Sequence, residues 1–365
     1  MPNLAQVAFL PFFISLAITT VLTFFSIPLA KKLGLIDDPK IHKHPGIIHT
    51  IPIPRGGGLP LYLGALLTSI IFIPVNSTFV AIFFGTLLVM VIGLIDDKLN
   101  AQSKDVSPYL RTIIQIIAAI IVVAGGVSAA FITNPISSGI IHLNIIKLSF
   151  LSLQTPILLS QIISILWLVW IMNMLNWSKG VDGQMPGIVA ISAIVIGILS
   201  LKINPAGHGG YIDSQLSFII AGTAIGFLFF NFYPAKIFPG FGATSLYLLL
   251  GVASILTSAK LATAILVMGV PLVDFMFTIV RRILAKKSPF QGDKKHLHHI
   301  LLKLGYSQRQ IALFYWSISG ILGLLSFLLQ SRSKLFAIFM VIAITGGALL
   351  FLHSITNKKN EKFST

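Results

Sequence analysis

The sequence predicts an all-α polytopic integral membrane protein, a bundle of about 11 transmembrane helices that forms one domain over residues 1–365. Two observations predict this fold. The chain is 55% hydrophobic and only 10% charged, and its mean hydropathy of +0.93 is well above that of soluble domains. Its apolar residues also fall into eleven runs, which can cross a hydrocarbon core of roughly 30 Å as helices.

The eleven runs are separated by short polar segments. In chain order they cover 7–30, 59–75, 78–95, 112–132, 156–175, 186–201, 215–232, 242–258, 261–280, 311–329 and 335–354. The shorter runs need ends that dip into the interface or a thinned bilayer. Alternating residues around 141–144 predict a small hairpin between two runs.

Lysine and arginine residues orient these helices. With the N-terminus outside and the C-terminus cytoplasmic, 21 of the 26 basic residues lie on the cytoplasmic side, as the positive-inside rule requires. The protein is therefore expected in the cell membrane as a multi-pass protein. Its cytoplasmic segments are about 31–58, 96–111, 176–185, 233–241 and 281–310, and a tail at 355–365.

Charge also restricts the function. The net charge is +16, but the basic residues are scattered between apolar runs without aromatic platforms, so anionic lipid headgroups or an anionic substrate fit better than nucleic acid. Eight of the ten acidic residues fall on the cytoplasmic side too. A transporter would carry ionisable groups near the bilayer midplane. The distribution instead favours a catalytic surface at the inner face.

The third run stops abruptly on two adjacent carboxylates, Asp96 and Asp97. Two like charges at a membrane boundary repel each other unless a cation compensates them. Carboxylate oxygens suit Mg2+, which takes one or two protein carboxylates and leaves its other positions to water and phosphates. The alternative is that the pair merely ends a helix at the water line.

The first inner segment contains Arg55 followed by three glycines, 56–58. Glycines let a backbone approach a phosphate, and the arginine supplies a planar donor fork. The alternative is a simple turn into the second run.

The third inner segment combines amides with a carboxylate. Asn173 and Asn176 lie three residues apart, hence on one helix face, and offer donors and acceptors to a base or sugar. Asp182 follows between glycines, free to accept from a base edge or join a metal shell. Helix capping is the plain alternative. In the fourth segment, Phe238 or Phe241 stacks a base or anchors the interface.

The longest inner segment, 281–310, carries eight basic residues and three histidines, His296, His298 and His299. This composition predicts a site for a multiply anionic group such as a diphosphate. A lipid-facing basic loop is the main alternative. Zinc is less favoured, because the chain has no cysteine to complete its ligand shell.

In this order, five motifs resemble those of the polyprenyl-phosphate N-acetylhexosamine-1-phosphate transferase family. The resemblance covers nearly the whole chain, and five motifs on successive inner segments make it specific. They are His49-x-x-Pro52-x-Pro54-Arg55-x-Gly57-Gly58, Gly93-x-x-Asp96-Asp97, Asn173-x-x-Asn176 with Asp182-Gly183, Asn231-x-x-Pro234-Ala235-Lys236-x-Phe238, and Asp293-Lys294-x-His296-Leu297-His298-His299.

The resemblance implies a transferase with Mg2+ as cofactor and Mn2+ as the alternative metal. The phosphate of a polyprenyl phosphate would attack the β-phosphorus of a UDP-N-acetylhexosamine and release UMP, which starts a cell-envelope glycan. A homodimer is implied too. By resemblance, Asp96 and Asp97 are catalytic, and Asp97 and Asp182 hold the metal. The substrate-binding residues would be His49, Arg55, Asn173, Asn176, Lys179, Asp182, Lys236, His296, His298 and His299.

Three positions depart from the family pattern. Asn100 stands where the family has a third carboxylate, although Asp105 lies in a similar context five residues later. Lys179 replaces a further aspartate, and Phe241 replaces a metal-binding one. Either Asp182 or Asp105 substitutes, or substrate mainly holds the metal, or activity is lost. Lys179 would take over part of the charge neutralisation. A catalytically silent relative that binds polyprenyl phosphate or nucleotide sugar is the alternative function.

Overall fold

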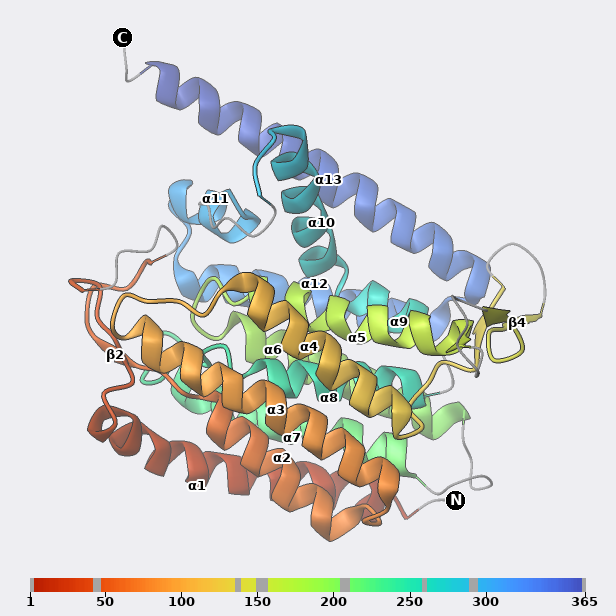
Figure 1. The fold of residues 1–365 in the computed structure, drawn as a ribbon. Helices are drawn as coiled ribbons and strands as arrows, with labels where there is room; N and C mark the ends of the chain where they lie inside the picture. Colours follow the sequence, from red (N-terminus) through yellow and green to blue (C-terminus); the bar gives the residue numbers. More distant parts are fainter. Residues whose placement is uncertain are drawn as a thin grey trace.

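This computed structural model describes residues 3–41, 47–134, 139–148, 157–203, 211–257, 261–288 and 295–362. Over these ranges most of the chain is helical (Figure 1). The helices are η1 (Ala5–Phe9, π-helical), α1 (Leu10–Lys32), α2 (Gly58–Phe72), α3 (Ser77–Asn100), α4 (Pro108–Ala124), α5 (Leu159–Trp177), α6 (Gln184–Ile203), α7 (Ile212–Asn231), α8 (Thr244–Leu256), α9 (Leu261–Val267), α10 (Gly269–Leu284), α11 (Leu297–Lys303), α12 (Gln308–Leu328) and α13 (Ser331–Lys362).

These helices make the chain a polytopic membrane protein, as predicted. Within the described residues, seven helices are long and apolar enough to cross a membrane, and the bent pair α9–α10 adds an eighth candidate. Helices α2, α4 and α8 are shorter apolar helices. Each predicted run coincides with one of these helices or with the bent pair.

The ninth predicted run, 261–280, is wrong as a single straight helix. α9 and α10 meet at Met268 with a bend of 82°. Pro271 explains the break, because a proline has no N–H to donate to the residue four positions earlier and its ring clashes with that carbonyl. That earlier residue is Val267, the last of α9. Helix α10 therefore runs across the direction of α1–α8, and α13 lies obliquely over it (Figure 1).

Helix α8 forms the centre of the bundle. All residues from Thr244 to Ile255 are buried, and the helix packs against α2, α3, α5, α6 and α7. Thirteen residues extend only about 20 Å at ~1.5 Å per residue. A helix shorter than the hydrocarbon core is tolerated here because protein, and not lipid, encloses it.

Glycines bring three backbone segments into direct contact beside α8. A Cβ on Gly58 or on Gly93 would overlap the backbone of Gly242, so α2 and α3 both pack directly on the loop before α8. The N–H of Gly57 donates to the carbonyl of Phe238 at 3.0 Å. The glycine run 56–58 thus forms a turn into α2 and a packing contact, which is the alternative to a phosphate-binding loop. The Gly57 N–H already donates to Phe238 and is not available to a phosphate.

Short antiparallel pairs connect some helices. β1 (Ile36–Asp37) pairs with β2 (Ile53–Pro54), β3 (Phe131–Thr133) with β4 (Ile140–His142), and β5 (Lys147–Leu148) with β6 (Ile157–Leu158). The β3–β4 pair confirms the predicted hairpin. The β1–β2 pair lies at one end of the bundle, on the side of α11 (Figure 1).

Candidate functional site

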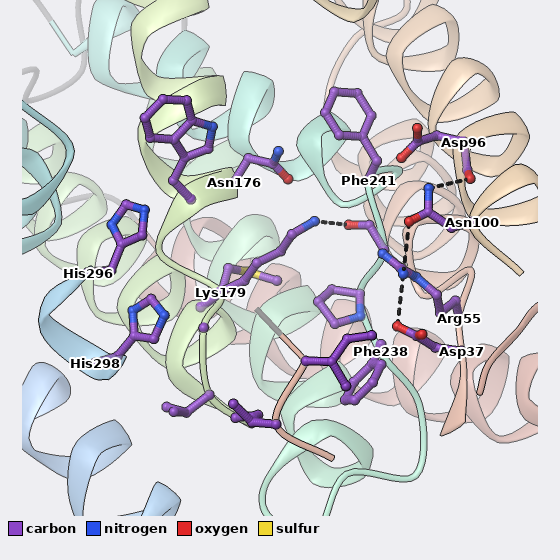
Figure 2. A pocket seen from close by; sticks show the side chains of 18 of the residues that line it. Asp37, Arg55, Asp96, Asn100, Asn176, Lys179, Phe238, Phe241, His296 and His298 are labelled. Carbon is purple, nitrogen blue, oxygen red and sulfur yellow. Dashed lines mark hydrogen bonds and ion pairs between the residues drawn. The ribbon is translucent and has the colours of Figure 1, made fainter. Parts of the chain in front are cut away.

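A cavity of about 380 Å³ opens at the end of the bundle that carries β1 and β2 (Figure 2). Its lining comes from the first segment, the α3–α4, α5–α6 and α7–α8 connections, the end of α10, and α11. Ten of the twelve predicted site residues line it: His49, Arg55, Asp96, Asn173, Asn176, Lys179, Asp182, His296, His298 and His299. The structure therefore brings together predicted residues from four separate segments.

The two other predicted residues, Asp97 and Lys236, do not line the cavity. Lys236 is exposed, on the loop between α7 and α8. Of the last motif, Asp293 and Lys294 lie outside the described residues. Asp97 is wholly buried, behind the lining.

Adjacent positions on α3 give the two aspartates different surroundings. The helix continues through both carboxylates to Asn100, so the pair does not end it. Asp96 faces the cavity, lies 3.3 Å from the Arg111 guanidinium and accepts the Val106 N–H at 3.1 Å. Asp97 Oδ1 accepts the Phe241 N–H at 3.1 Å.

Arg55 connects the first segment to the end of α3. Its Nη1 donates to Asp37 Oδ2 at 2.9 Å and to Asn100 Oδ1 at 3.3 Å (Figure 2). Its Nε lies 3.4 Å from Asp97 Oδ1. The β1–β2 pairing supports this geometry, because it holds the strand of Asp37 beside the strand that precedes Arg55. One guanidinium thus compensates two carboxylates.

Lys179 projects into the middle of the cavity (Figure 2). Its Nζ donates to the carbonyl of Gly240 at 2.8 Å and lies 6.0 Å from the centre of the Phe241 ring. Burial and the nearby Arg55 guanidinium lower the pKa of Lys179 to about 7. Nearby carboxylates act in the opposite direction, and a bound anion would do the same.

Phe241 fills the space between two cations. Arg111 lies over its ring at 5.1 Å from the centroid, and Lys179 lies near it on the cavity side. The ring is 4% exposed. An aromatic face attracts cations, so Phe241 helps to hold these two side chains where they are.

The α5–α6 and α7–α8 connections are fastened to each other. Asn231 accepts the Gly183 N–H at 3.1 Å and donates to the carbonyl of Ile237 at 2.9 Å. Asp182 accepts the Ala235 N–H at 3.0 Å. Burial raises the pKa of Asp182, although this hydrogen bond and the neighbouring His49 lower it.

The two asparagines lie on one face of α5, as predicted, and both line the cavity. Asn173 donates to Gln115 Oε1 at 2.8 Å and to the carbonyl of Val169 at 2.9 Å. Asn176 Oδ1 is buried without a hydrogen-bond partner among the described residues. Its acceptor is therefore available to a ligand donor.

The histidines form the opposite wall, and a buried acid orients them. His296 Nδ1 lies 2.9 Å from Asp274 Oδ2, and the Leu297 N–H donates to the other carboxylate oxygen at 2.9 Å. A carboxylate only accepts, so Nδ1 carries the proton and Nε2 is left as an acceptor. The His296 and His298 rings stack at 5.5 Å. Burial, with His299 and His296 nearby, lowers the pKa of His298 well below its usual value.

Sequence interpretation missed several residues of this site. Asp37, Arg111 and Arg282 line the cavity, and Asp274, which lies within the ninth predicted run, holds His296. A signal existed for Asp274, because a carboxylate inside an apolar run is expected to have a function or a buried partner. Arg282 lies over the Trp177 ring at 5.0 Å, a contact that no sequence spacing indicates.

The residues present do not fit a divalent metal well. Among the residues that the structure describes, no three acidic or histidine side chains lie close enough together to hold one. Oδ1 of the buried Asp97 already has a cationic and an N–H partner, whereas Oδ2 has no hydrogen-bond partner among the described residues. The Lys179 side chain, and not a carboxylate, occupies the middle of the cavity (Figure 2). The Mg2+ or Mn2+ site at Asp97 and Asp182 stays a prediction that this donor set does not support.

Comparison with known proteins places the chain in a family. Residues 79–258 match the family described as glycosyl transferase family 4. This range includes α3 to α8 and most of the residues around Lys179.

Similar proteins cover more of the chain. A probable undecaprenyl-phosphate N-acetylglucosaminyl 1-phosphate transferase of Bacillus subtilis is 30% identical over 96% of this chain and 93% of its own length. A decaprenyl-phosphate N-acetylglucosaminephosphotransferase of Mycolicibacterium smegmatis is 32% identical over 80% of this chain and 75% of its own length. The undecaprenyl-phosphate alpha-N-acetylglucosaminyl 1-phosphate transferase of Escherichia coli K12 is 27% identical over 80% of this chain and 76% of its own length. The chain therefore belongs to glycosyl transferase family 4, a family of membrane-embedded sugar-1-phosphate transferases.

Proposed function

We propose that this protein transfers an N-acetylhexosamine 1-phosphate from a UDP-sugar to a polyprenyl phosphate and releases UMP, which starts a cell-envelope glycan. The names of the relatives indicate N-acetylglucosamine as the sugar. One observation carries the proposal. Cationic, amide and imidazole side chains from five segments converge on a single cavity at one end of a membrane bundle.

We infer that this end faces the cytoplasm and that all eleven helical units cross the cell membrane, with the N-terminus outside. The cytoplasm supplies nucleotide sugars, and the segments with the most basic residues surround the cavity. The homodimer stays a prediction.

The proposed reaction exchanges one phosphoanhydride for another. An oxygen of the lipid phosphate attacks the β-phosphorus of the UDP-sugar, the bond from that phosphorus to the bridging oxygen breaks, and UMP leaves with the electron pair. Such a transfer needs little covalent help from protein. It needs both phosphates held in line and their charge neutralised.

The two walls suggest which substrate lies where. Arg55 and Asp96 lie on one side of the cavity and His296 and His298 on the other (Figure 2). Arg55, and Arg111 beside Asp96, would bind the lipid phosphate. The histidine wall would hold the sugar diphosphate. Asn176 at the end of α5, with its unpartnered acceptor, would bind the uracil or the sugar.

Purified protein in detergent is expected to release UMP from UDP-N-acetylglucosamine only when polyprenyl phosphate is present. A panel of UDP-amino sugars defines the donor, and Asp97→Asn, which weakens the charge compensation of Arg55, should reduce release. If no donor yields UMP while the protein still binds UDP-sugar, the transferase proposal fails in favour of a silent binding protein.

Asp274→Asn is expected to slow UMP release by about tenfold to a hundredfold. The amide N–H would donate to His296 Nδ1, so the imidazole proton would move to Nε2 and Nε2 would no longer be an acceptor. The Leu297 N–H keeps an acceptor in this variant. Asp213→Asn, at the buried start of α7, is the matched control. An unchanged rate in Asp274→Asn would show that the orientation of His296 does not matter.

A further inference from the structure

The carboxylates that line or support the cavity are largely compensated by the protein itself. Asp96 pairs with Arg111, and Asp97 and Asp37 share Arg55. Asp182 accepts a backbone N–H. These contacts compensate Asp37, Asp96 and one oxygen of Asp97. Asp97 Oδ2 is buried without a hydrogen-bond partner among the described residues, and Asp105 also lines the cavity.

Four cationic side chains line the open volume, and two of them, Arg55 and Arg111, are the ion-pair partners just described. Arg55, Arg111, Lys179 and Arg282 all line it. Four carboxylates, Asp37, Asp96, Asp105 and Asp182, line the same cavity, so a ligand meets positive and negative groups side by side. Arginine and lysine are the side chains that recognise phosphate, and Lys179 is a lining cation whose described contacts are a carbonyl and an aromatic ring and not a carboxylate.

Lys179 occupies the central position among these cations. The Gly240 carbonyl accepts one of its three N–H groups at 2.8 Å, and the Phe241 ring lies 6.0 Å away. The ammonium thus has N–H groups left for a ligand, while its place is fixed from the side of the α7–α8 connection. The Phe241 ring supports the charge without a ligand oxygen that could bind a metal.

We propose that the Lys179 ammonium is the built-in counter-cation of this site, which binds the diphosphate of the nucleotide sugar so that neither binding nor transfer requires a divalent metal. This inference rests on the proposed function. The bonds made and broken are those of the transfer described above. Lys179 supplies hydrogen bonds and positive charge to the β-phosphate and the bridging oxygen, and no proton has to move.

The first test measures nucleotide binding and turnover in excess EDTA and in Mg2+. Calorimetric titration with UDP-N-acetylglucosamine is expected to give the same affinity within about twofold in both buffers. UMP release should likewise be equal. Release that falls to background in EDTA and returns with Mg2+ would overturn the proposal.

The second test removes the cation. Lys179→Met is expected to weaken UDP-N-acetylglucosamine binding at least tenfold in both buffers. The control is Lys202→Met, which removes another lysine that lies over an aromatic ring, Phe327 at 5.0 Å, outside the cavity. Thermal unfolding of each variant checks that it folds. Unchanged binding in a folded Lys179→Met variant would overturn the proposal.

A third test rebuilds carboxylates at the two positions. The double variant Lys179→Asp with Phe241→Asp is expected to bind the nucleotide sugar only in Mg2+ and to show a Mg2+-dependent rise in unfolding temperature that the parent protein lacks. A parent protein that itself shows this rise would contradict the inference. If UMP is never released but Lys179-dependent binding in EDTA persists, the transferase proposal fails while the counter-cation stands.

Discussion

Arg55→Ala is expected to abolish most activity, with UMP release lower by about a hundredfold to a thousandfold. The reason is that this guanidinium serves two buried carboxylates and also faces the substrate cavity. Its removal takes the shortest ion pair from Asp37 and the guanidinium from Asp97, next to an incoming phosphate. The unfolding free energy should also fall by about 3 kcal/mol, the usual cost of breaking a buried pair from one side.

Two further variants make this prediction specific. Arg55→Lys keeps the charge, but an ammonium cannot reach Asp37 and Asp97 together. Its rate of UMP release should lie between those of the parent protein and Arg55→Ala. Arg309→Ala removes an exposed guanidinium that bonds the Tyr233 carbonyl outside the cavity and should change the rate less than twofold, as surface contacts are weak. Equal rates for all three variants would show that Arg55 is only structural.

Gly93→Ala is expected to destabilise the protein by about 3 kcal/mol, at the upper end of what overpacking usually costs. The added methyl would overlap the backbone of Gly242, which cannot swing aside as a side chain can. Gly93 lies one helical turn before Asp97 on α3, so any shift of the helix also moves the carboxylates. Thermal unfolding in detergent and UMP release should both decline.

Gly320→Ala is the matched control for this prediction. Gly320 lies inside α12, where an added Cβ meets no atom within 4 Å. Alanine is the better helix former by about 0.5–1 kcal/mol, so this variant should be as stable as the parent or slightly more so. Equal unfolding temperatures for Gly93→Ala and Gly320→Ala would mean that α3 does not need its close contact.

Most of the fold could be predicted from the sequence because each apolar run carries its own signal. The runs and the hairpin near residue 141 coincide with observed elements. The bend at Met268 was not predicted, because hydropathy reports how apolar a run is and not whether its helix is straight. Pro271, four residues after Val267, was the local sign of that break.

The site could be predicted only as a set of segments. Loops that share one side of a membrane are expected to meet, and ten predicted residues do line one cavity. The direction of each side chain depends on helix phase and packing. Neighbours such as Asp96 and Asp97 therefore differ, one facing the cavity and the other buried behind it, and Lys236 points away.

The glycine contacts around α8 divide this site into a frame and a set of replaceable parts. Gly58, Gly93 and Gly242 define where three backbones touch: an added Cβ on Gly58 or Gly93 would overlap backbone atoms, and one on Gly242 would make a tight contact. The side chains of Lys179 and Phe241 lie in the space beside this frame, and the Phe241 N–H bond to Asp97 does not depend on its side chain. An ancestral lineage could thus exchange acidic groups for a lysine and an aromatic ring without rebuilding the scaffold, and we expect variation among homologues to be broad at 179 and 241 but almost nil at the three glycines.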